Sequence, residues 1–253
     1  APRVVVAAAE PSPKSPRRKA RRCLTWMLQS GSATCGRKDR ADDRSGAETV
    51  WQDRQGKTRS CRGVQMPAPT FRTERLILRA FREADAEALH GILCQEGTLG
   101  YFPNPDRPTV SNVRKLVARQ ISQWEDLGYA WWAVESKITG ELLGWNGLQY
   151  LPETGETEIA FLLDANHWGR GLTTEAGRVG LEFGFETLAL EQIVALAHPE
   201  NGASRRVIEK LGLRLTGEAV YFGMAVCRYA LDAKAYRSAV GDESALQRGP
   251  SIS

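Results

Sequence analysis

Two glycines stand close together where an expected strand meets an expected helix, in the segment NHWGRGLTT at residues 166–174. Gly169 and Gly171 let the backbone approach a ligand without a clash at Cβ. The helix that follows offers free N–H groups and a partial positive charge at its first turn. This combination is suited to binding a pyrophosphate. A tight strand-to-helix turn without a ligand would use the same residues, so the loop alone leaves both interpretations open.

Two commoner phosphate-binding motifs do not match this loop. The dinucleotide fingerprint requires a third glycine three residues after the second, where Thr174 stands. The P-loop requires a Gly-Lys-Ser/Thr ending, and the loop contains no lysine. Metal chemistry is not indicated either, because the five cysteines show no CxxC spacing and the three histidines form no HExxH pair. We therefore predict no metal site.

Four segments of the chain have a recognisable pattern: residues 73–79 (TERLILR), 158–163 (EIAFLL), 168–176 (WGRGLTTEA) and 199–213 (PENGASRRVIEKLGL). In the same order, they resemble segments of the GNAT superfamily (GCN5-related N-acetyltransferases). The likeness spans about residues 70–232 and is greatest for the branch of ribosomal-protein N-terminal acetyltransferases, the Rim-type enzymes. One departure is Asn166, because the superfamily often has glutamine or arginine three residues before the first glycine.

The resemblance implies acetyl-CoA as cosubstrate and an acetyl group transferred directly to a primary amine. It also implies that the pantetheine arm pairs with the strand before the loop, like an added strand. The implied fold is an α/β (α+β) domain with one mixed, mostly antiparallel sheet, splayed at the cofactor site and flanked by helices. The implied cofactor contacts are Phe161, Leu162, Leu163, Trp168, Gly169, Arg170, Gly171, Leu172, Thr173, Thr174 and Asn201.

Glu158 is the candidate general base, because an ammonium group must lose a proton before it attacks a thioester. It lies on the expected strand before the loop, where the family's acceptor site adjoins the thioester. A carboxylate there can take the proton directly or through water. Glu156 and Thr157 are polar as well, so an exposed strand glutamate without a catalytic role is the alternative.

Asn201 and Ser204 stand at the start of an expected helix. Asparagine is a favoured N-cap and Ser204 follows three residues later, so capping alone would explain both. In the Rim-type pattern the matching asparagine contacts the pantetheine arm, and the matching serine gives a proton to the departing thiolate. The resemblance therefore makes Ser204 a catalytic candidate, with Tyr221 and Tyr229 as further proton donors.

Strand and helix patterns alternate from residue 71 onward. The order is one strand, two helices, three strands, a helix, a strand, a helix and two strands, which predicts one mixed sheet covered by helices. Short turns between the three successive strands favour antiparallel pairing there. The expected strands are residues 75–81, 129–135, 141–151, 156–163, 192–197, 213–220 and 224–231, and the expected helices are 83–93, 109–127, 170–187 and 201–211.

Charge divides the chain into two parts. Residues 1–66 carry 15 Lys and Arg against 6 Asp and Glu, whereas residues 67–253 carry 19 against 24. We expect residues 1–66 to be a disordered basic leader, residues 67–236 the acetyltransferase domain and residues 237–253 a flexible tail. One hypothesis makes Met66 the natural start and the leader not native. A nucleic-acid-binding arm is disfavoured, because the basic run at 11–22 has no interleaved aromatic residues.

The expected function is N-acetyl transfer to an amine-bearing small molecule or a protein N-terminus, by a monomer or a homodimer. A non-catalytic acyl-CoA-binding sensor or scaffold is the alternative. Cys94 and Cys227 have no matched histidine, so we expect no covalent enzyme intermediate. No stretch approaches 18 apolar residues and the N-terminus lacks a secretory pattern, which favours a cytoplasmic protein without a membrane partner.

Overall fold

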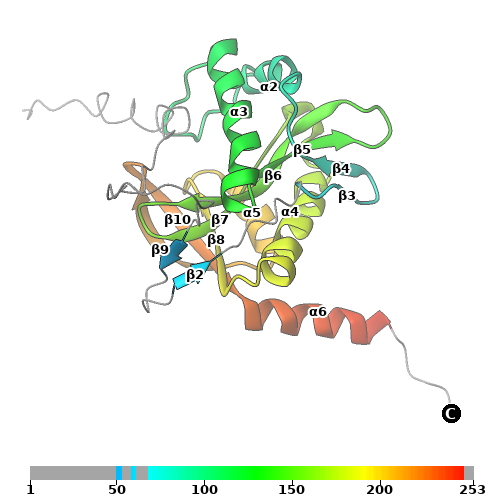
Figure 1. Cartoon of the computed structure of the whole chain (residues 1–253), viewed down its shortest axis with the longest axis vertical. Coiled ribbons are helices and arrows are strands. Elements are labelled where there is room, and N and C mark those ends of the chain that lie inside the picture. Colours follow the sequence, from blue (N-terminus) through cyan, green and yellow to red (C-terminus); the bar gives the residue numbers. More distant parts are fainter. Residues whose placement is uncertain (1–49, 53–57, 61–67, 248–253) are drawn as a thin grey trace, which may run out of the picture.

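The computed structural model describes residues 50–52, 58–60 and 68–247 of the chain. Between residues 68 and 247 the strands form one eight-stranded sheet in the order β3-β4-β5-β6-β7-β8-β10-β9 (Figure 1). Neighbouring strands in it are antiparallel, except that β7 and β8 run parallel. The strands are β3 (Phe71–Arg72), β4 (Leu76–Arg79), β5 (Trp131–Ser136), β6 (Leu142–Leu151), β7 (Glu156–Leu163), β8 (Gln192–Ala197), β9 (Arg214–Tyr221) and β10 (Met224–Asp232).

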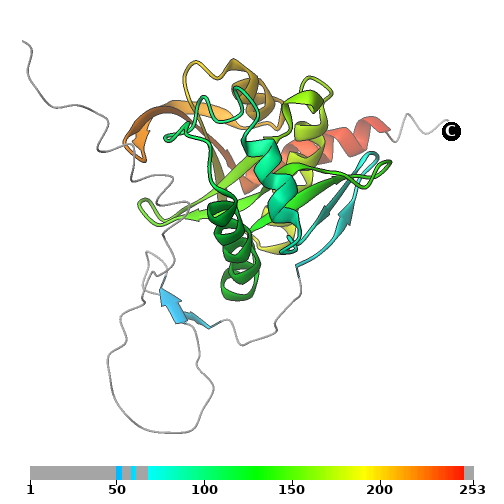
Figure 2. The same ribbon diagram turned by 90° about the horizontal axis from the view of Figure 1, so that it is seen from above.

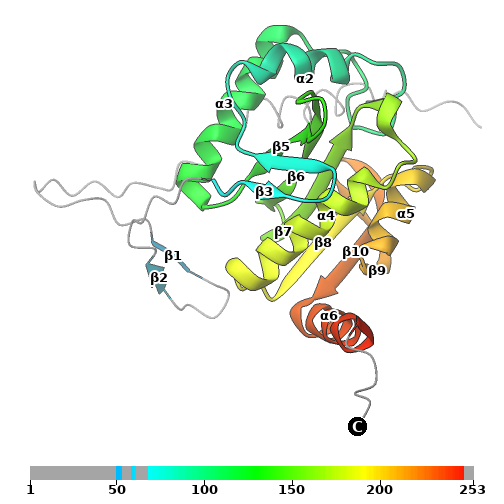
Figure 3. The same ribbon diagram turned by 90° about the vertical axis from the view of Figure 1, so that its right-hand side faces the viewer.

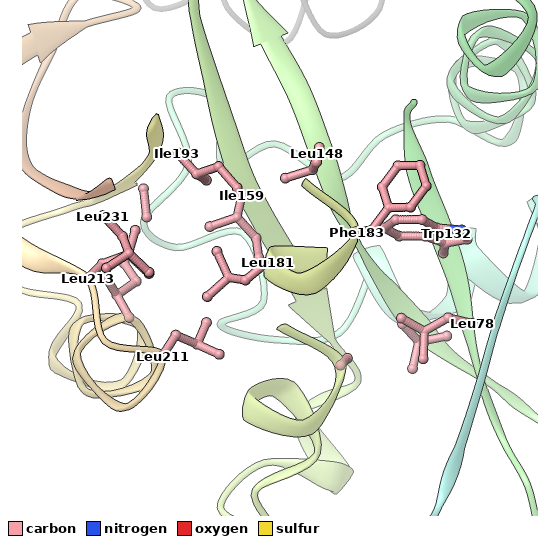
Figure 4. Packing of buried hydrophobic residues seen from close by; sticks show 14 of the residues in the cluster. Leu78, Trp132, Leu148, Ile159, Leu181, Phe183, Ile193, Leu211, Leu213 and Leu231 are labelled. Atoms are coloured by element: carbon pink, nitrogen blue, oxygen red, sulfur yellow. The ribbon is translucent and has the colours of Figure 1, made fainter. Parts of the chain in front are cut away.

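Helices cover both faces of this sheet (Figure 3). On one face Leu116 of α3 packs with Trp131 and Trp145 of the sheet. On the other face, Leu181 and the residues around it pack on Ile159 (Figure 4). The fold class expected from the sequence is confirmed. The helices are α2 (Asp85–Leu93), α3 (Val110–Leu127), the short 3-10 helix η1 (Ala165–His167), α4 (Leu172–Glu182), the π-helix η2 (Phe183–Thr187), α5 (Gly202–Lys210) and α6 (Ala233–Gln247).

The parallel strands β7 and β8 diverge soon after they meet. Within the described residues one pair joins them, Glu158 with Val194. Beyond it β7 remains paired with β6, and β8 remains paired with β10. We call this divergence, between residues 159–163 of β7 and 195–197 of β8, the fork. Because the two strands point the same way, α4 and α5 both begin near the open end of the fork.

Helix α3 begins and ends as its sequence predicts. Thr109 is extended and its side chain accepts a hydrogen bond from the Asn112 N–H at 3.2 Å, which caps the first turn. Gly128 takes the left-handed conformation, with φ of 74°, and ends the helix. The central strand β8 is buried on both faces, as its continuous apolar run predicts.

The expected helix at 170–187 differs in the structure. Regular α-helix ends at Glu182, and Phe183–Thr187 continues as a π-helical turn. Gly184 lies in this turn, and a Cβ there would stand only 2.5 Å from the Ile193 side chain. The chain therefore approaches β8 more closely here than a helix with larger side chains can. Helical periodicity in the sequence does not predict this close approach or the change to a π-helical turn.

The expected flexible tail is helical over most of its length. Helix α6 runs from Ala233 to Gln247, so the domain boundary placed at residue 236 falls inside it (Figure 2). The Asp232 carboxylate accepts a hydrogen bond from the Ala235 N–H at 2.8 Å at its start. Tyr236 stacks on Phe185, with ring centroids 4.7 Å apart. A tertiary contact thus stabilises a segment that sequence polarity suggested would fray.

Most of the predicted leader lies outside the described residues. Within it the structure describes β1 (Val50–Gln52) and β2 (Thr58–Ser60), which pair in an antiparallel manner. The hypotheses on residues 1–49, on Met66 and on residues 248–253 concern parts of the chain that are not described. No helix in the described part is long and apolar enough to cross a membrane.

A buried ion pair ties α2 to the sheet. Arg79 of β4, only 9% exposed, donates to the two carboxylate oxygens of Asp85 at 2.8 and 2.9 Å. It also donates to Glu135 of β5 at 2.7 Å. Asp85 in turn accepts from the Arg82 N–H at 2.7 Å, at the start of α2. This network fixes α2 against the face of the sheet on which Trp131 and Trp145 lie.

We predict that Asp85→Asn lowers the free energy of unfolding by about 3 kcal/mol, because it leaves the buried Arg79 charge short of a partner. The matched change Glu87→Gln lies on the same helix but removes an exposed partner of Arg114. It should leave the stability unchanged within error. Urea unfolding at pH 7 measures both, and equal effects would contradict the structural role of the Arg79 network.

Candidate active site

The glycine loop, residues 166–174, leads from the end of β7 into α4. Gly169 and Gly171 both have positive φ, 75° and 77°, which non-glycine residues rarely adopt. A Cβ at Gly169 would meet no atom within 4 Å, so the loop is open on that side. The Trp168 indole N–H donates to the Leu163 carbonyl at 2.7 Å and fastens the loop to the end of β7.

The two helices at the open end of the fork begin differently. Gly171 is the N-cap of α4, and no side chain in the described residues caps that helix. In α5 the Asn201 side-chain oxygen accepts from the Ser204 N–H at 3.0 Å. The first turn of α4 therefore keeps N–H groups available to an anion, whereas capping uses the carbonyl oxygen of the Asn201 amide.

Glu158 is buried at the base of the fork. It is 6% exposed, and one carboxylate oxygen accepts from the Gln149 amide of β6 at 2.5 Å. Burial raises the pKa of Glu158 to about 7, although the hydrogen bond from Gln149 and a backbone hydrogen bond from Leu196 of β8 act to lower it. The carboxyl group of this β7 residue thus accepts hydrogen bonds from both neighbouring strands, β6 and β8. The interpretation of Glu158 as an exposed strand residue is wrong.

Glu156, two residues earlier on β7, has a different environment. Tyr221 donates to it at 2.6 Å, and Arg228 forms an ion pair with it. Burial acts to raise the pKa of Glu156, but the hydrogen bonds from Tyr221 and Arg228 outweigh it and hold that pKa below its ordinary value. The Glu156 carboxylate is therefore already engaged by Tyr221 and Arg228.

The two tyrosines considered as proton donors are engaged elsewhere. Tyr221 donates to Glu156, as described above. The fully buried Tyr229 hydroxyl accepts from Arg205 at 2.8 Å and donates to Glu209 at 3.3 Å. Ser204 is half-buried, and its hydroxyl has no hydrogen-bond partner among the described residues. Of the three, Ser204 is the one whose hydroxyl is not already used.

These features together suit a nucleotide thioester. The uncapped start of α4 and the open glycine loop suit a pyrophosphate. The backbone of β7 along the fork has no β8 partner past Glu158, so it can pair with an extended ligand arm. Of the predicted contacts, Leu172 is buried, while Arg170 is exposed and Thr173 and Thr174 are half-buried around the first turn.

Comparison with known proteins identifies the family. A family model described as an acetyltransferase (GNAT) domain matches residues 75–214, which is more than half of the chain. The chain belongs to the GNAT acetyltransferase family. The resemblance of the four sequence segments is thereby confirmed. The model begins at Arg75 of the first segment and ends just after the last one.

Individual relatives match this acetyltransferase over most of their own length. The uncharacterized protein YkkB of Bacillus subtilis is 33% identical over 151 residues, covering 56% of this chain and 83% of YkkB. A GNAT acetyltransferase structure from Bacillus anthracis superposes with a TM-score of 0.58 at 25% identity, covering 66% of this chain and 99% of that one. Each is a protein that this acetyltransferase resembles in sequence or fold.

A Rim-type enzyme shares the fold as well. RimL, described as a ribosomal L7/L12 alpha-N-protein acetyltransferase in complex with coenzyme A, superposes with a TM-score of 0.57 at 21% identity. The match covers 66% of this chain and 99% of RimL.

In the described part of this acetyltransferase, no group of three or more His, Cys, Asp or Glu side chains is placed to hold a metal ion.

Sequence reasoning missed two parts of this site. Gln149 precedes Glu158 by nine residues, and only the β6–β7 register brings their side chains together. Arg75 and Glu175 belong to two of the quoted segments but lie 100 residues apart, and the structure joins them beside the glycine loop. From the sequence alone, Arg75 and Glu175 could each have formed a salt bridge with many other charged residues. No spacing rule connects such distant positions.

The raised pKa of Glu158 predicts a loss of stability as pH rises. Below its ordinary value of 4.5 the carboxyl is protonated in both the folded and the unfolded chain. Between 4.5 and about 7 only the unfolded chain ionises, so the free energy of unfolding falls, by roughly 3 kcal/mol in total. Glu158→Gln should therefore be more stable than the wild type at pH 8 but not at pH 4.

The neighbouring Glu156→Gln is the matched control and should behave oppositely. Its wild-type carboxylate is stabilised by Tyr221 and Arg228, so that stability is present above the ordinary pKa and Glu156→Gln loses it at pH 8. Urea unfolding at pH 4, 6 and 8 compares the three proteins. Parallel pH profiles for Glu158→Gln and the wild type would show that Glu158 is not a buried, titrating group.

Proposed function

We propose that this chain is an acetyl-CoA-dependent N-acetyltransferase acting on a primary amine. The observation that carries the proposal is the fork, with the uncapped start of α4 at its open end and the buried Glu158 carboxyl at its base. Acetyl-CoA supplies an acetyl group activated as a thioester. Membership of the GNAT family supports the assignment.

Separate elements would hold separate parts of acetyl-CoA. Residues 168–174 would hold the pyrophosphate through backbone N–H groups of the loop and of the first turn of α4. The backbone of Phe161, Leu162 and Leu163 would hold the pantetheine arm along the fork. Asn201 would contribute its amide N–H₂, since its oxygen is used in capping α5.

Glu158 would accept the proton that the amine must lose. A base works best when its pKa lies near the working pH, and burial brings the pKa of Glu158 to about 7. Gln149 donates a hydrogen bond to one oxygen of the carboxylate and so restricts the orientation of the group. Ser204, whose hydroxyl is unengaged among the described residues, would hold the proton that the leaving sulfur requires.

Direct transfer is preferred to a covalent enzyme intermediate. Cys227 is buried. The Cys94 sulfur does lie 3.4 Å from His90 Nε2, contrary to the expectation that it has no matched histidine. The same nitrogen lies 3.1 Å from the Pro108 carbonyl, which can only accept a hydrogen bond, so Nε2 carries a hydrogen. It therefore cannot take the thiol proton from Cys94.

The acceptor would bind on the face of the sheet that carries Glu158. Strand pairing places Trp131 and Trp145 on this face, stacked with ring centroids 3.8 Å apart, beneath α2 and α3. An amine-bearing small molecule and a protein N-terminus are both proposed acceptors, and the enzyme would act as a monomer or homodimer. The cytoplasmic location stays a prediction.

Release of free thiol from acetyl-CoA, measured with a panel of primary amines and N-terminal peptides, tests the function. We expect turnover with at least one amine and an acid limb with an apparent pKa of about 7. Glu158→Gln should lower kcat about a hundredfold at pH 8 and leave acetyl-CoA affinity unchanged. Tight CoA binding with no turnover on any amine would instead support a sensor or scaffold.

Gly171→Val tests the glycine loop. Valine strains a backbone with φ of 77° and changes the conformation of the loop, so we expect CoA binding to weaken about a hundredfold or more. Gly212→Val is the matched control, because Gly212 has φ of 88° in open space at the far end of α5. Calorimetric titration with CoA should distinguish them. Equal affinities would show that the loop does not bind the cofactor.

A further inference from the structure

A dense hydrogen-bond network lies beneath the glycine loop. Glu175, in the first turn of α4, accepts at one oxygen from the Thr73 hydroxyl at 2.5 Å and from the Arg75 N–H at 2.9 Å. Its other oxygen accepts from Arg75 Nε at 2.7 Å and Nη2 at 2.6 Å. One carboxylate therefore joins the start of α4 to the chain segment that enters β4.

The network extends into the loop through Arg75. Its third nitrogen, Nη1, donates at 2.9 Å to the carbonyl of Arg170, the residue between the two loop glycines. Nη2 stands 3.7 Å from where a Cβ of Gly171 would lie. The guanidinium group thus connects Glu175, in the first turn of α4, to the Arg170 carbonyl. The glycines on either side of Arg170 would otherwise allow that peptide group to rotate.

Glu175 is ionised at neutral pH. Burial alone would raise its pKa, but the hydrogen bonds from Thr73 and Arg75 outweigh burial and keep that pKa below its ordinary value. The Glu175 side chain is 16% exposed and that of Arg75 is 42% exposed. The ion pair is therefore partly shielded, and several bonds of different direction fix its geometry.

We propose that Arg75 and Glu175 are positioning residues that hold the pyrophosphate loop in its binding conformation. A carbonyl oxygen turned toward a pyrophosphate would repel it, whereas the neighbouring N–H groups attract it. Arg75 donates a hydrogen bond to the Arg170 carbonyl and thereby keeps this carbonyl dipole turned away from the anion. Glu175 holds the Arg75 side chain in the position that this requires. The inference rests on the proposed function, in which this loop binds the cofactor.

The sign of one substitution separates positioning from simple electrostatics. Glu175 carries a negative charge next to a site for a polyanion, so its removal by itself should tighten CoA binding. If Glu175 positions the loop through Arg75, the same removal should weaken CoA binding. Loss of stability alone, without a positioning role, would leave the affinity of the folded protein unchanged.

The experiment is calorimetric titration of the full chain with CoA, comparing the wild type with Glu175→Gln. We expect the Kd to rise about tenfold, which corresponds to losing one charge-assisted hydrogen bond. At saturating acetyl-CoA, kcat should change less than about twofold, because the chemistry is not touched. Glu182→Gln is the matched control, since it removes the same charge from the exposed far end of α4 and should leave Kd unchanged.

Thr73→Val is the milder variant in case Glu175→Gln does not fold. It removes one of the bonds to Glu175 and should raise the Kd about threefold. An unchanged or lower Kd in folded Glu175→Gln, or in Thr73→Val where only that variant folds, would overturn the positioning role. Failure of the wild type to bind CoA would instead refute the proposed function, so the two failures are distinguishable.

Discussion

Between β7 and β8 the backbone ladder stops after one parallel pair, and the geometry of the site follows from this interruption. Two parallel strands that diverge leave main-chain groups without a partner, and such groups need another hydrogen-bonding partner, from solvent or a ligand. The parallel direction has a second consequence. It places the ends of both strands, and the starts of α4 and α5, at the same edge of the sheet. Antiparallel pairing here would have separated these elements.

The same divergence creates the environment of Glu158. Its side chain is buried between β6 and β8, where Gln149 and Leu196 reach it, yet no cation lies within hydrogen-bonding distance of it among the described residues. Glu156, two residues away, has Arg228 as an ion-pair partner. The two carboxylates on one strand therefore differ in pKa because burial dominates at Glu158, whereas hydrogen bonds from Tyr221 and Arg228 outweigh burial at Glu156. This difference supports the proposed role of Glu158 in proton transfer.

The glycine loop shows how a flexible segment becomes a defined one. Glycines at 169 and 171 permit left-handed backbone conformations but do not select one arrangement of the peptide between them. Side-chain hydrogen bonds to backbone carbonyls hold the loop in place in the structure. Arg75 binds the carbonyl of Arg170, Trp168 binds that of Leu163, and Glu175 anchors Arg75. The proposed anion site would thus depend on side chains from the segment before β4, from the loop itself and from α4.

The sequence by itself determined the elements and the family. Period-2 and period-3.6 patterns and turn residues located the main strands and helices to within a few residues, because these signals are local. The segments at 73–79, 158–163, 168–176 and 199–213 carried the family resemblance, because their residue types stand at fixed spacing. The loop, Asn201 and Ser204 could be singled out for the same reason. The π-helical turn at Phe183–Thr187 and helix α6 were missed, because both depend on packing partners.

Only the tertiary structure decided the state of each candidate side chain. Polarity around Glu158 left exposure open, and the fold buried it beside Gln149. The sequence does not distinguish the hydroxyl groups of Tyr221 and Tyr229 from those of other tyrosines, whereas the structure shows them bonded to Glu156 and Arg205. Arg75 and Glu175 meet across 100 residues. Burial, pKa and hydrogen-bond partners depend on residues distant in the chain, and a single sequence does not record which distant residues become neighbours.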